Sequence, residues 1–318
     1  MQVSPRVSAV IPAFGRPELV VRAVRSVLAQ TMADLEVVVV VDGPDEATGR
    51  ALAGLGDPRV RVIELPEKGG AQKARNTGVR EARAPWTAML DDDDEWLPEK
   101  LAKQLAAAEA SGASRPIVAS RLLNRTPRAE YAMPRRLRQA GEPWSEYFTV
   151  RRGLFHGEGF IQTSTIMAPT EVLRQVPFAP KVPRMQELDW TLRALAVEGT
   201  ELLYVEEPLV IWHQDEDRPR ISFEAKWQQS LDWLRRNESL VTKKAYAAIV
   251  LSVVSSMAAQ TRSPKVFWLL LREAQRRGRP GFIDYVTFLQ IWLIPPGLRR
   301  TLRDKALSRA SSPQAELV

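Results

Sequence analysis

The first 110 residues alternate between short apolar runs and longer segments whose apolar residues recur with helical spacing. The run LEVVVVVD at 35–42 contains five consecutive valines, which is typical of a strand covered on both sheet faces. We expect strands at 7–12, 35–42, 59–65 and 86–90, alternating with helices at 17–30, 45–55, 70–84 and 97–111. This alternation predicts an α/β fold with a mostly parallel sheet flanked by helices, and ligands at the carboxyl ends of the strands.

The second half of the chain is less regular. The segment 120–160 holds eight arginines and scattered prolines, so we expect a long loop region with short helices there. A strand at 162–169, a helix at 186–197 and a strand at 201–212 should follow, and the remaining residues have helical spacing. We therefore expect two domains, an α/β domain at 1–220 and a basic helical C-terminal extension at 221–318.

Composition excludes several kinds of chemistry. The chain has no cysteine, which excludes disulfides, thiolate metal sites and cysteine nucleophiles. It has only two histidines, His156 and His213. It contains neither a signal-peptide pattern nor an apolar run long enough to span a membrane, so we expect a cytoplasmic protein.

The net charge of +7 is concentrated in the last part of the chain. From residue 261 onward there are 11 basic and 4 acidic residues, an excess equal to that of the whole chain. The same segment carries the apolar runs VFWLLL and FLQIWLI. A basic, partly apolar segment suits peripheral contact with the anionic inner face of a membrane, and it equally suits a solvated helix with one buried stripe. Nucleic acid is the less favoured partner, and we predict none.

The strongest chemical motif is LDDDDEWLP at 90–98, where Asp91, Asp92, Asp93 and Asp94 follow an apolar strand. Four adjacent carboxylates repel one another unless a cation lies among them. Mg²⁺ and Mn²⁺ prefer carboxylate oxygens and also bind substrate phosphates, so we expect one of these two ions here. The alternative is a polar loop whose acids favour the N-terminus of the next helix.

Two other segments can contribute to a phosphate or nucleoside site. Asp42 ends the valine-rich strand, where a carboxylate is well placed to bond a nucleoside, although it can equally open the turn DGPD. In KGGAQKARNTGVREA at 68–82, two glycines precede a helix whose first turns carry Lys73 and Arg75. Such a start can receive phosphate, although the segment alone fits a loop before an amphipathic helix.

Candidate acid–base residues lie further along the chain. Glu187 and Asp189 occur in QELDW at a predicted helix start, where either could act as a general base or simply complement the helix dipole. His213 follows a strand directly and could ligate a metal, bond a phosphate or serve a structural role. His156 could contact an acceptor, although a structural role is the simpler interpretation.

Taken in order, these segments resemble the inverting nucleotide-sugar glycosyltransferases of the GT-A fold, glycosyltransferase family 2. The resemblance covers most of residues 7–198 and depends on VSAVIPAFGRPELVVRAVRSVLAQT, LEVVVVVDGP, KGGAQKARNTGVREA, WTAMLDDDDEWLPEKL and QELDWTLRAL. Together with the residue chemistry, it assigns the donor nucleotide sugar to Pro12, Ala13, Phe14, Arg16, Asp42, Lys73, Arg75, Asp91 and Asp92. It assigns the metal to Asp91 and Asp93, with His213 as a further ligand. The base position matches Glu187, where the family usually has Asp, and Asp189 is the fallback.

The resemblance implies a metal-dependent transfer of a sugar, with inversion, to a hydroxyl of a glycan or lipid-linked acceptor, as in cell-surface polysaccharide biosynthesis. A UDP-sugar is the expected donor because uridine is commonest in the family. Two alternatives remain open: a catalytically silent nucleotide- or glycan-binding module, and a nucleotidyltransferase. The second is disfavoured because PAFGRPE, after the first strand, has a single glycine rather than a glycine-rich loop.

Overall fold

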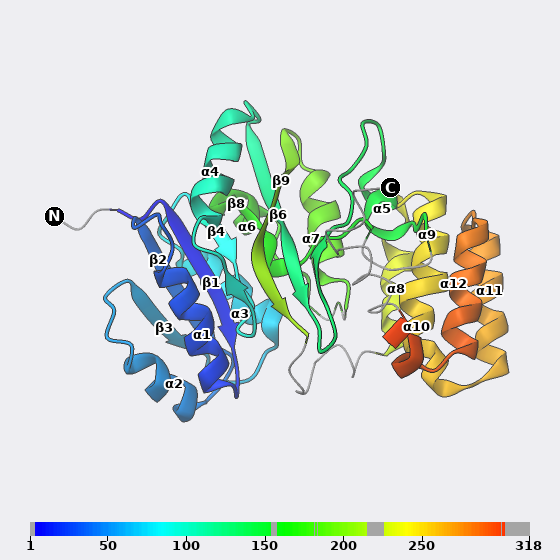
Figure 1. Ribbon diagram of the computed structural model, residues 1–318, viewed down its shortest axis with the longest axis horizontal. Helices are drawn as coiled ribbons and strands as arrows, with labels where there is room; N and C mark the ends of the chain where they lie inside the picture. Colours follow the sequence, from blue (N-terminus) through cyan, green and yellow to red (C-terminus); the bar gives the residue numbers. More distant parts are fainter. Residues whose placement is uncertain are drawn as a thin grey trace, which may run out of the picture. The chain divides into compact units, whose positions relative to one another are not determined.

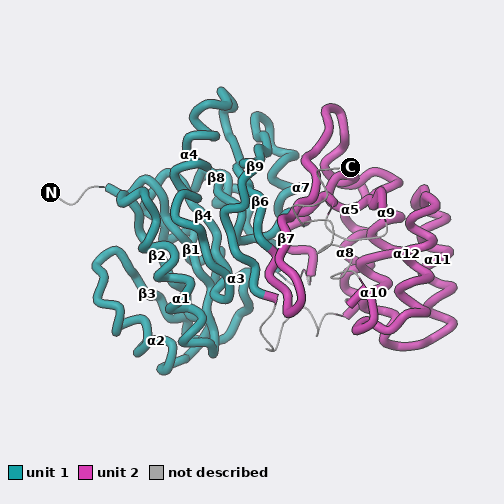
Figure 2. Tube along the Cα trace, viewed as in Figure 1, with its two compact units in different colours: residues 1–123, 161–180, 189–213 teal, residues 124–160, 181–188, 214–318 magenta. Residues whose placement is uncertain are grey.

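The computed structural model describes residues 4–153, 158–180, 182, 184–214, 226–299 and 301–302. These residues form two compact units, and each unit draws on segments that are far apart in the sequence (Figure 2). The first unit comprises Met1–Leu123, Ile161–Pro180 and Asp189–His213, and the second comprises Asn124–Phe160, Lys181–Leu188 and Gln214–Val318. The domain boundary expected at 220 falls outside the described residues and stays a prediction.

The first unit is built on the expected parallel strands. Four of them pair in the order β3–β2–β1–β4 (Figure 1). They are β1 (Val7–Ala13), β2 (Leu35–Val41), β3 (Val60–Glu64) and β4 (Trp86–Met89). Every residue of β1 and β2 is buried, as the apolar runs predict. Helices α1 (Pro17–Leu28), α2 (Glu46–Ala53) and α3 (Ala71–Glu81) connect these strands.

Beyond β4 the sheet becomes antiparallel, so the α/β fold is confirmed but its parallel part is limited to four strands. Strand β8 (Met167–Pro169) pairs antiparallel with β4 and with β6 (Arg115–Arg125), and β9 (Thr200–His213) pairs antiparallel with β5 (Glu95–Trp96). Helices α4 (Lys100–Ala110), α6 (Thr170–Gln175) and α7 (Gln186–Leu195) complete this region of the chain.

The prediction of a loop region at 120–160 is wrong for its first residues. Strand β6 continues to Arg125, and β7 (Glu130–Met133) pairs with it. A tight turn joins the two strands, because the backbone N–H of Thr126 donates to the carbonyl of Ala129 over 2.8 Å. Residues 116–120 of β6 are all buried, and burial alternates from Arg121 to Arg125, even though the strand contains three arginines. Tertiary burial therefore overrides the polar appearance of this segment.

The second unit is mainly helical, which confirms the expected helical C-terminal region. Its helices include α5 (Trp144–Thr149), α8 (Trp227–Arg236), α9 (Lys243–Ala248), α10 (Ser255–Ala258), α11 (Pro264–Arg277) and α12 (Phe282–Leu293). A π-helical stretch, η4 (Ile249–Val254), joins α9 to α10 and is largely buried. None of the helices in the described part of the chain is long and apolar enough to cross a membrane.

Candidate active site

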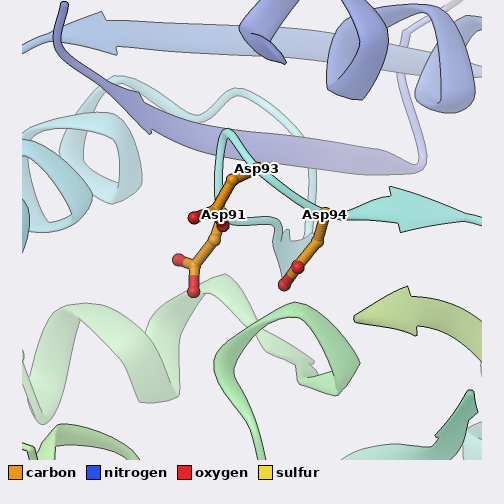
Figure 3. Close-up of side chains that lie close together, drawn as sticks. All are labelled: Asp91, Asp93 and Asp94. Atoms are coloured by element: carbon orange, nitrogen blue, oxygen red, sulfur yellow. The ribbon is translucent and has the colours of Figure 1, made fainter. Parts of the chain in front are cut away.

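The four consecutive aspartates form a tight turn between β4 and β5. The backbone N–H of Asp94 donates to the carbonyl of Asp91 over 3.1 Å, which folds the loop back on itself. As a result, carboxylate oxygens of Asp91, Asp93 and Asp94 all lie within 4.8 Å of one another (Figure 3). This spacing is compatible with one cation shared by three carboxylates.

Three arginines approach the loop from other elements. Arg75 of α3 donates from Nη2 to Oδ1 of Asp91 over 2.6 Å. Arg16, in the turn between β1 and α1, lies 2.9 Å from a carboxylate oxygen of both Asp92 and Asp93. Arg22 of α1 donates to the backbone carbonyl of Asp93 over 3.0 Å, so three guanidinium groups contact a loop of four carboxylates.

Burial further disfavours the ionised forms of two aspartates in this loop. Burial raises the pKa of Asp92 to about 7; the Arg16 charge opposes this rise, and the Asp93 and Asp91 charges add to it. Burial likewise raises the pKa of Asp94 well above its usual range, and the charges of Asp93 and Asp91 contribute. One buried oxygen of Asp92 and one of Asp94 have no hydrogen-bond partner among the described residues.

These observations test whether the loop fits a divalent metal. Carboxylate oxygens are the donor set that Mg²⁺ and Mn²⁺ prefer, and a buried oxygen without a partner costs free energy until something binds it. Asp91, Asp93 and Asp94 therefore fit such an ion. Asp94 was not among the predicted ligands, and the prediction of His213 as a further ligand stays a prediction.

Two side chains that sequence reasoning missed hold the loop in place. Asp94 accepts hydrogen bonds from Nε2 of Gln162 over 2.8 Å and from Oγ of Ser164 over 2.6 Å. The Ser164 Oγ also accepts from the backbone N–H of Asp91 over 3.0 Å. The indole N–H of Trp96 fixes this serine in turn, by donating to its carbonyl over 2.8 Å.

The same contacts explain why the strand expected at 162–169 is wrong in its first half. Residues Thr163–Thr165 form a 3₁₀ turn, η1, and only Met167–Pro169 is a strand. The side-chain oxygen of Gln162 accepts from the backbone N–H of Ser164 over 2.7 Å and caps the turn. The four polar residues in QTSTIM were the available signal, because unpaired polar side chains are unusual on a buried strand.

The expected nucleoside residues gather at the ends of β1 and β2. The two carboxylate oxygens of Asp42 accept from the backbone N–H groups of Gly69 and Gly70, each over 2.8 Å. Asp42 thereby fixes the start of α3, and its own N–H donates to the carbonyl of Ala13 over 2.9 Å. Pro12 and Ala13 are buried in β1, and the next residue, Phe14, is the first exposed one.

Two lysines lie beside this region. The Nζ of Lys68 lies 4.0 Å from the centre of the Phe14 ring, a cation–π contact at the rim of the site. Lys73 is more than a third exposed and pairs with Glu67 over 3.3 Å. Among the described contacts Lys73 therefore turns towards an acid of its own loop, whereas Arg75 turns towards the aspartate loop.

The segment after β8 supports Arg75. The Arg75 guanidinium lies 5.5 Å from the centre of the Phe178 ring. Asn76 fixes Phe178 by two 2.9 Å hydrogen bonds, one to its backbone carbonyl and one from its backbone N–H. The Phe178 ring also stacks on Trp190 of α7, with ring centres 5.6 Å apart.

The structure separates the two candidate bases by environment. Asp189 is buried, and its Oδ2 accepts from Nη2 and Nε of Arg193 over 2.5 and 3.0 Å. Glu187 is half-buried and belongs to the second unit, whereas Asp189 belongs to the first. His213 lies with its Nε2 2.6 Å from Oε1 of Glu95, immediately after the aspartate loop. His156 lies outside the described residues.

A mixed α/β sheet with an arginine-bound aspartate loop at its strand ends is the arrangement that the sequence motifs predicted for a nucleotide-sugar transferase. The family model described as "Glycosyl transferase family 2" matches residues 8–176, more than half of the chain. The chain belongs to glycosyltransferase family 2, as the sequence motifs predicted.

Solved structures agree on the fold. The crystal structure of S. aureus TarS 1–349 in complex with UDP-GlcNAc is similar, with a TM-score of 0.55 and 15% sequence identity. The match covers 93% of this chain and 83% of that one. At this identity the likeness shows the fold alone, which is GT-A.

The curated relatives named below match part of the chain. The succinoglycan biosynthesis protein ExoO of Rhizobium meliloti is 42% identical over 109 residues, which are 34% of this chain and 31% of that protein. The amylovoran biosynthesis glycosyltransferase AmsB of Erwinia amylovora is 27% identical over 216 residues, 65% of this chain and 69% of that protein. The chain thus spans less than a third of the length of ExoO and about two thirds of AmsB.

Proposed function

We propose that this protein is a metal-dependent inverting glycosyltransferase that moves a sugar from a nucleotide-diphosphate donor to a hydroxyl group. The observation that carries the proposal is the cluster of Asp91, Asp93 and Asp94, with the Arg75 guanidinium bound to it. A catalytically silent binding module would not need three converging carboxylates, one of which has a buried oxygen without a hydrogen-bond partner among the described residues. Family membership supports the same reaction class.

The donor would lie across the ends of β1, β2 and β4. Asp42 and the segment from Pro12 to Arg16 would hold the nucleoside, and Arg75 would face the diphosphate, with Lys73 nearby. Asp91 and Asp93 would hold Mg²⁺ or Mn²⁺ with Asp94, and His213 stays a proposed further ligand. When bound, such an ion neutralises charge on the diphosphate leaving group. A UDP-sugar is the first donor to test, because the similar TarS structure holds UDP-GlcNAc.

Glu187 acts as the general base in this account. It takes the proton from the acceptor hydroxyl, and the oxygen attacks the anomeric carbon from the side opposite the leaving group. The bond from that carbon to the diphosphate oxygen breaks, so the configuration inverts and the nucleoside diphosphate leaves with the electron pair. Asp189 is the weaker candidate, because Arg193 already engages its carboxylate with two hydrogen bonds. We assign Asp189 to positioning α7.

The acceptor is a glycan or a lipid-linked saccharide of a cell-surface polysaccharide. Relatives named for succinoglycan and amylovoran biosynthesis support the polysaccharide assignment. The excess of positive charge from residue 261 onward supports an acceptor presented at an anionic surface, and with it a cytoplasmic location at the inner face of a membrane.

Product analysis tests the proposal. Sugar nucleotides with uridine, guanosine, thymidine or cytidine are incubated with Mn²⁺ and a panel of glycan and lipid-linked acceptors. A transferase releases nucleoside diphosphate and forms a glycoside of inverted anomeric configuration. Release of pyrophosphate would instead indicate a nucleotidyltransferase, and donor binding without turnover over the whole panel would indicate a silent binding module.

A further inference from the structure

The last helices of the second unit expose an unusual number of large apolar side chains. Of the nine large apolar residues exposed in the described part of the chain, seven lie beyond residue 260. They are Trp268, Leu269, Phe282, Leu289, Leu293, Leu298 and Leu302. Phe282 and Leu293 are 79% and 76% exposed, and Trp268 is 55% exposed, so these are not side chains that merely border a core.

The exposed residues lie on regular faces of two helices that pack together. On α12, Phe282, Leu289 and Leu293 are separated by seven and four residues, which puts them on one side of the helix. On α11, Trp268 and Leu269 lie together near the middle. The two helices lie side by side (Figure 1) and are joined through the Phe267 ring of α11, whose centre is 4.6 Å from that of Phe288.

Basic residues flank the apolar ones on α11. A groove along this helix is lined by Lys265, Trp268, Leu269, Arg272, Glu273 and Arg276. The spacing of three, four and seven residues places the cations on the same face as the tryptophan. Within the described part of the chain, Lys265, Arg272 and Arg276 form no ion pair, so their charges are directed to solvent.

The acids of the same helices do not neutralise this face. Glu273 accepts two 2.8 Å hydrogen bonds from Arg235 and one from the Tyr246 hydroxyl, so its charge is already engaged within the unit. Asp284 is buried and accepts from the backbone N–H of Gly281, capping α12. The exposed face of α11 therefore combines apolar side chains with positive charge that these acids do not neutralise.

We propose that the exposed face of α11, the C-terminal docking face (Lys265, Trp268, Leu269, Arg272 and Arg276), binds an anionic lipid membrane. Trp268 and Leu269 insert into the boundary between headgroups and acyl chains, and the cations bind lipid phosphates. This inference deepens the proposed function. Only the purpose of membrane binding rests on that function, and the purpose is to hold the enzyme where a lipid-linked acceptor is presented.

Charge complementarity decides between the possible occupants. A second copy of the chain would bring Lys265, Arg272 and Arg276 against their own kind, and like charges across an interface oppose association. A nucleic acid would match the charge, but it would leave Leu269 exposed, because phosphate contacts do not bury aliphatic side chains. An anionic membrane satisfies both the charged and the apolar residues.

Vesicle sedimentation with the full chain tests the proposal. The protein should sediment with vesicles of phosphatidylglycerol and phosphatidylcholine at low salt, and should stay in solution with phosphatidylcholine alone. The double variant Arg272→Gln/Arg276→Gln should bind about 25-fold more weakly, since each cation near such a surface contributes about fivefold. The matched variant Arg25→Gln/Arg50→Gln removes two exposed charges from the first unit and should bind like the parent.

A second measurement asks whether the apolar residues enter the lipid. Vesicles with brominated acyl chains should quench part of the tryptophan fluorescence, and Trp268→Phe, which keeps an aromatic ring, should lose a measurable share of that quenching. Equal binding to neutral vesicles, equal loss in the Arg25/Arg50 variant, or unchanged quenching in Trp268→Phe would overturn the proposal. So would a concentration-dependent dimer that Leu269→Ser dissolves, or tighter binding to a short DNA duplex than to the vesicles.

The outcome is separable from that of the transferase assignment. Vesicle binding is measured without donor, and UDP release is measured with a soluble acceptor and no lipid. Loss of vesicle binding with unchanged UDP release contradicts only the docking face. Absent UDP release with normal vesicle binding contradicts only the transferase.

Discussion

Arg75 donates a 2.6 Å hydrogen bond to Asp91 and so joins the first turns of α3 to the aspartate loop after β4. Its side chain is only 6% exposed, whereas that of Asp91 is 22% exposed. The arginine is therefore fixed by the fold, and the carboxylate is the partner open to a ligand. This arrangement places one positive charge permanently beside the proposed cation and diphosphate.

Replacing Arg75 should cost stability as well as activity. Arg75→Met leaves the Asp91 carboxylate without its charged partner, and we expect the free energy of unfolding to fall by about 2 kcal/mol. In the Asp91→Asn background the same replacement should cost markedly less. Urea denaturation of the four proteins measures this coupling, and additive effects of the two substitutions would contradict it.

The two candidate bases should respond differently to substitution. Glu187→Gln should lower kcat by roughly 10²–10⁴-fold and leave donor binding unchanged, because only the proton acceptor is lost. Asp189→Asn should mainly lower the melting temperature, because it weakens the contacts with Arg193. Near-normal turnover of Glu187→Gln, together with loss of turnover in a stable Asp189→Asn protein, would reverse the assignment.

Close packing at Gly78 should control the position of α3. A Cβ at this residue would lie 2.4 Å from a methyl carbon of Val10 in β1, so Gly78→Ala must shift the helix that carries Arg75. We expect a loss of about 1–3 kcal/mol of stability and weaker nucleotide binding. Val10→Ala should restore part of both in the double variant. If the double variant is no more stable than Gly78→Ala alone, the clash is not the cause.

Lys100 should make the free energy of unfolding depend on pH in the alkaline range. It is fully buried, its Nζ lies 2.6 Å from Oε1 of Gln104 and 4.0 Å from the centre of the Trp96 ring, and burial lowers its pKa well below the usual range. Between the folded pKa and about 10.4 the unfolded chain binds more protons, so stability should rise with pH, by at most about 1.4 kcal/mol per unit.

The control for this effect is a matched substitution. Lys100→Met should remove the rise, whereas Lys265→Met, at an exposed position, should keep it. Chemical denaturation at several pH values between 7 and 10 provides the comparison. A parent protein whose stability does not change over that interval would show that Lys100 is not held in its neutral form.

Local pattern was sufficient to predict the strands that carry the site. Five consecutive valines predicted β2, and the aspartates after β4 predicted the loop that brings Asp91 and Asp93 together. Both features are short-range, because a buried strand and the acids after it are adjacent in sequence. Membership of the family was predicted correctly from the order of such segments.

The contacts that shape the site could not be predicted in this way. Ser164 and Gln162 bond to Asp94 across about seventy residues of sequence, and no spacing rule connects them. The engagement of Arg16 with Asp92 and Asp93 depends likewise on how the β1–α1 turn meets the loop. The burial of β6 was hidden by its arginines, because sequence pattern does not show which side chains the fold leaves at the surface.

The most direct test of the site is a thermal-shift comparison of UDP, GDP, dTDP and CDP, each with and without Mn²⁺. A ligand at 100 times its dissociation constant stabilises the folded protein by about 2.7 kcal/mol, which is readily measured. The account predicts a shift with one diphosphate, UDP first, that requires Mn²⁺ and disappears in Asp93→Asn. A shift that persists without metal and in Asp93→Asn, or no shift with any nucleotide, would contradict it.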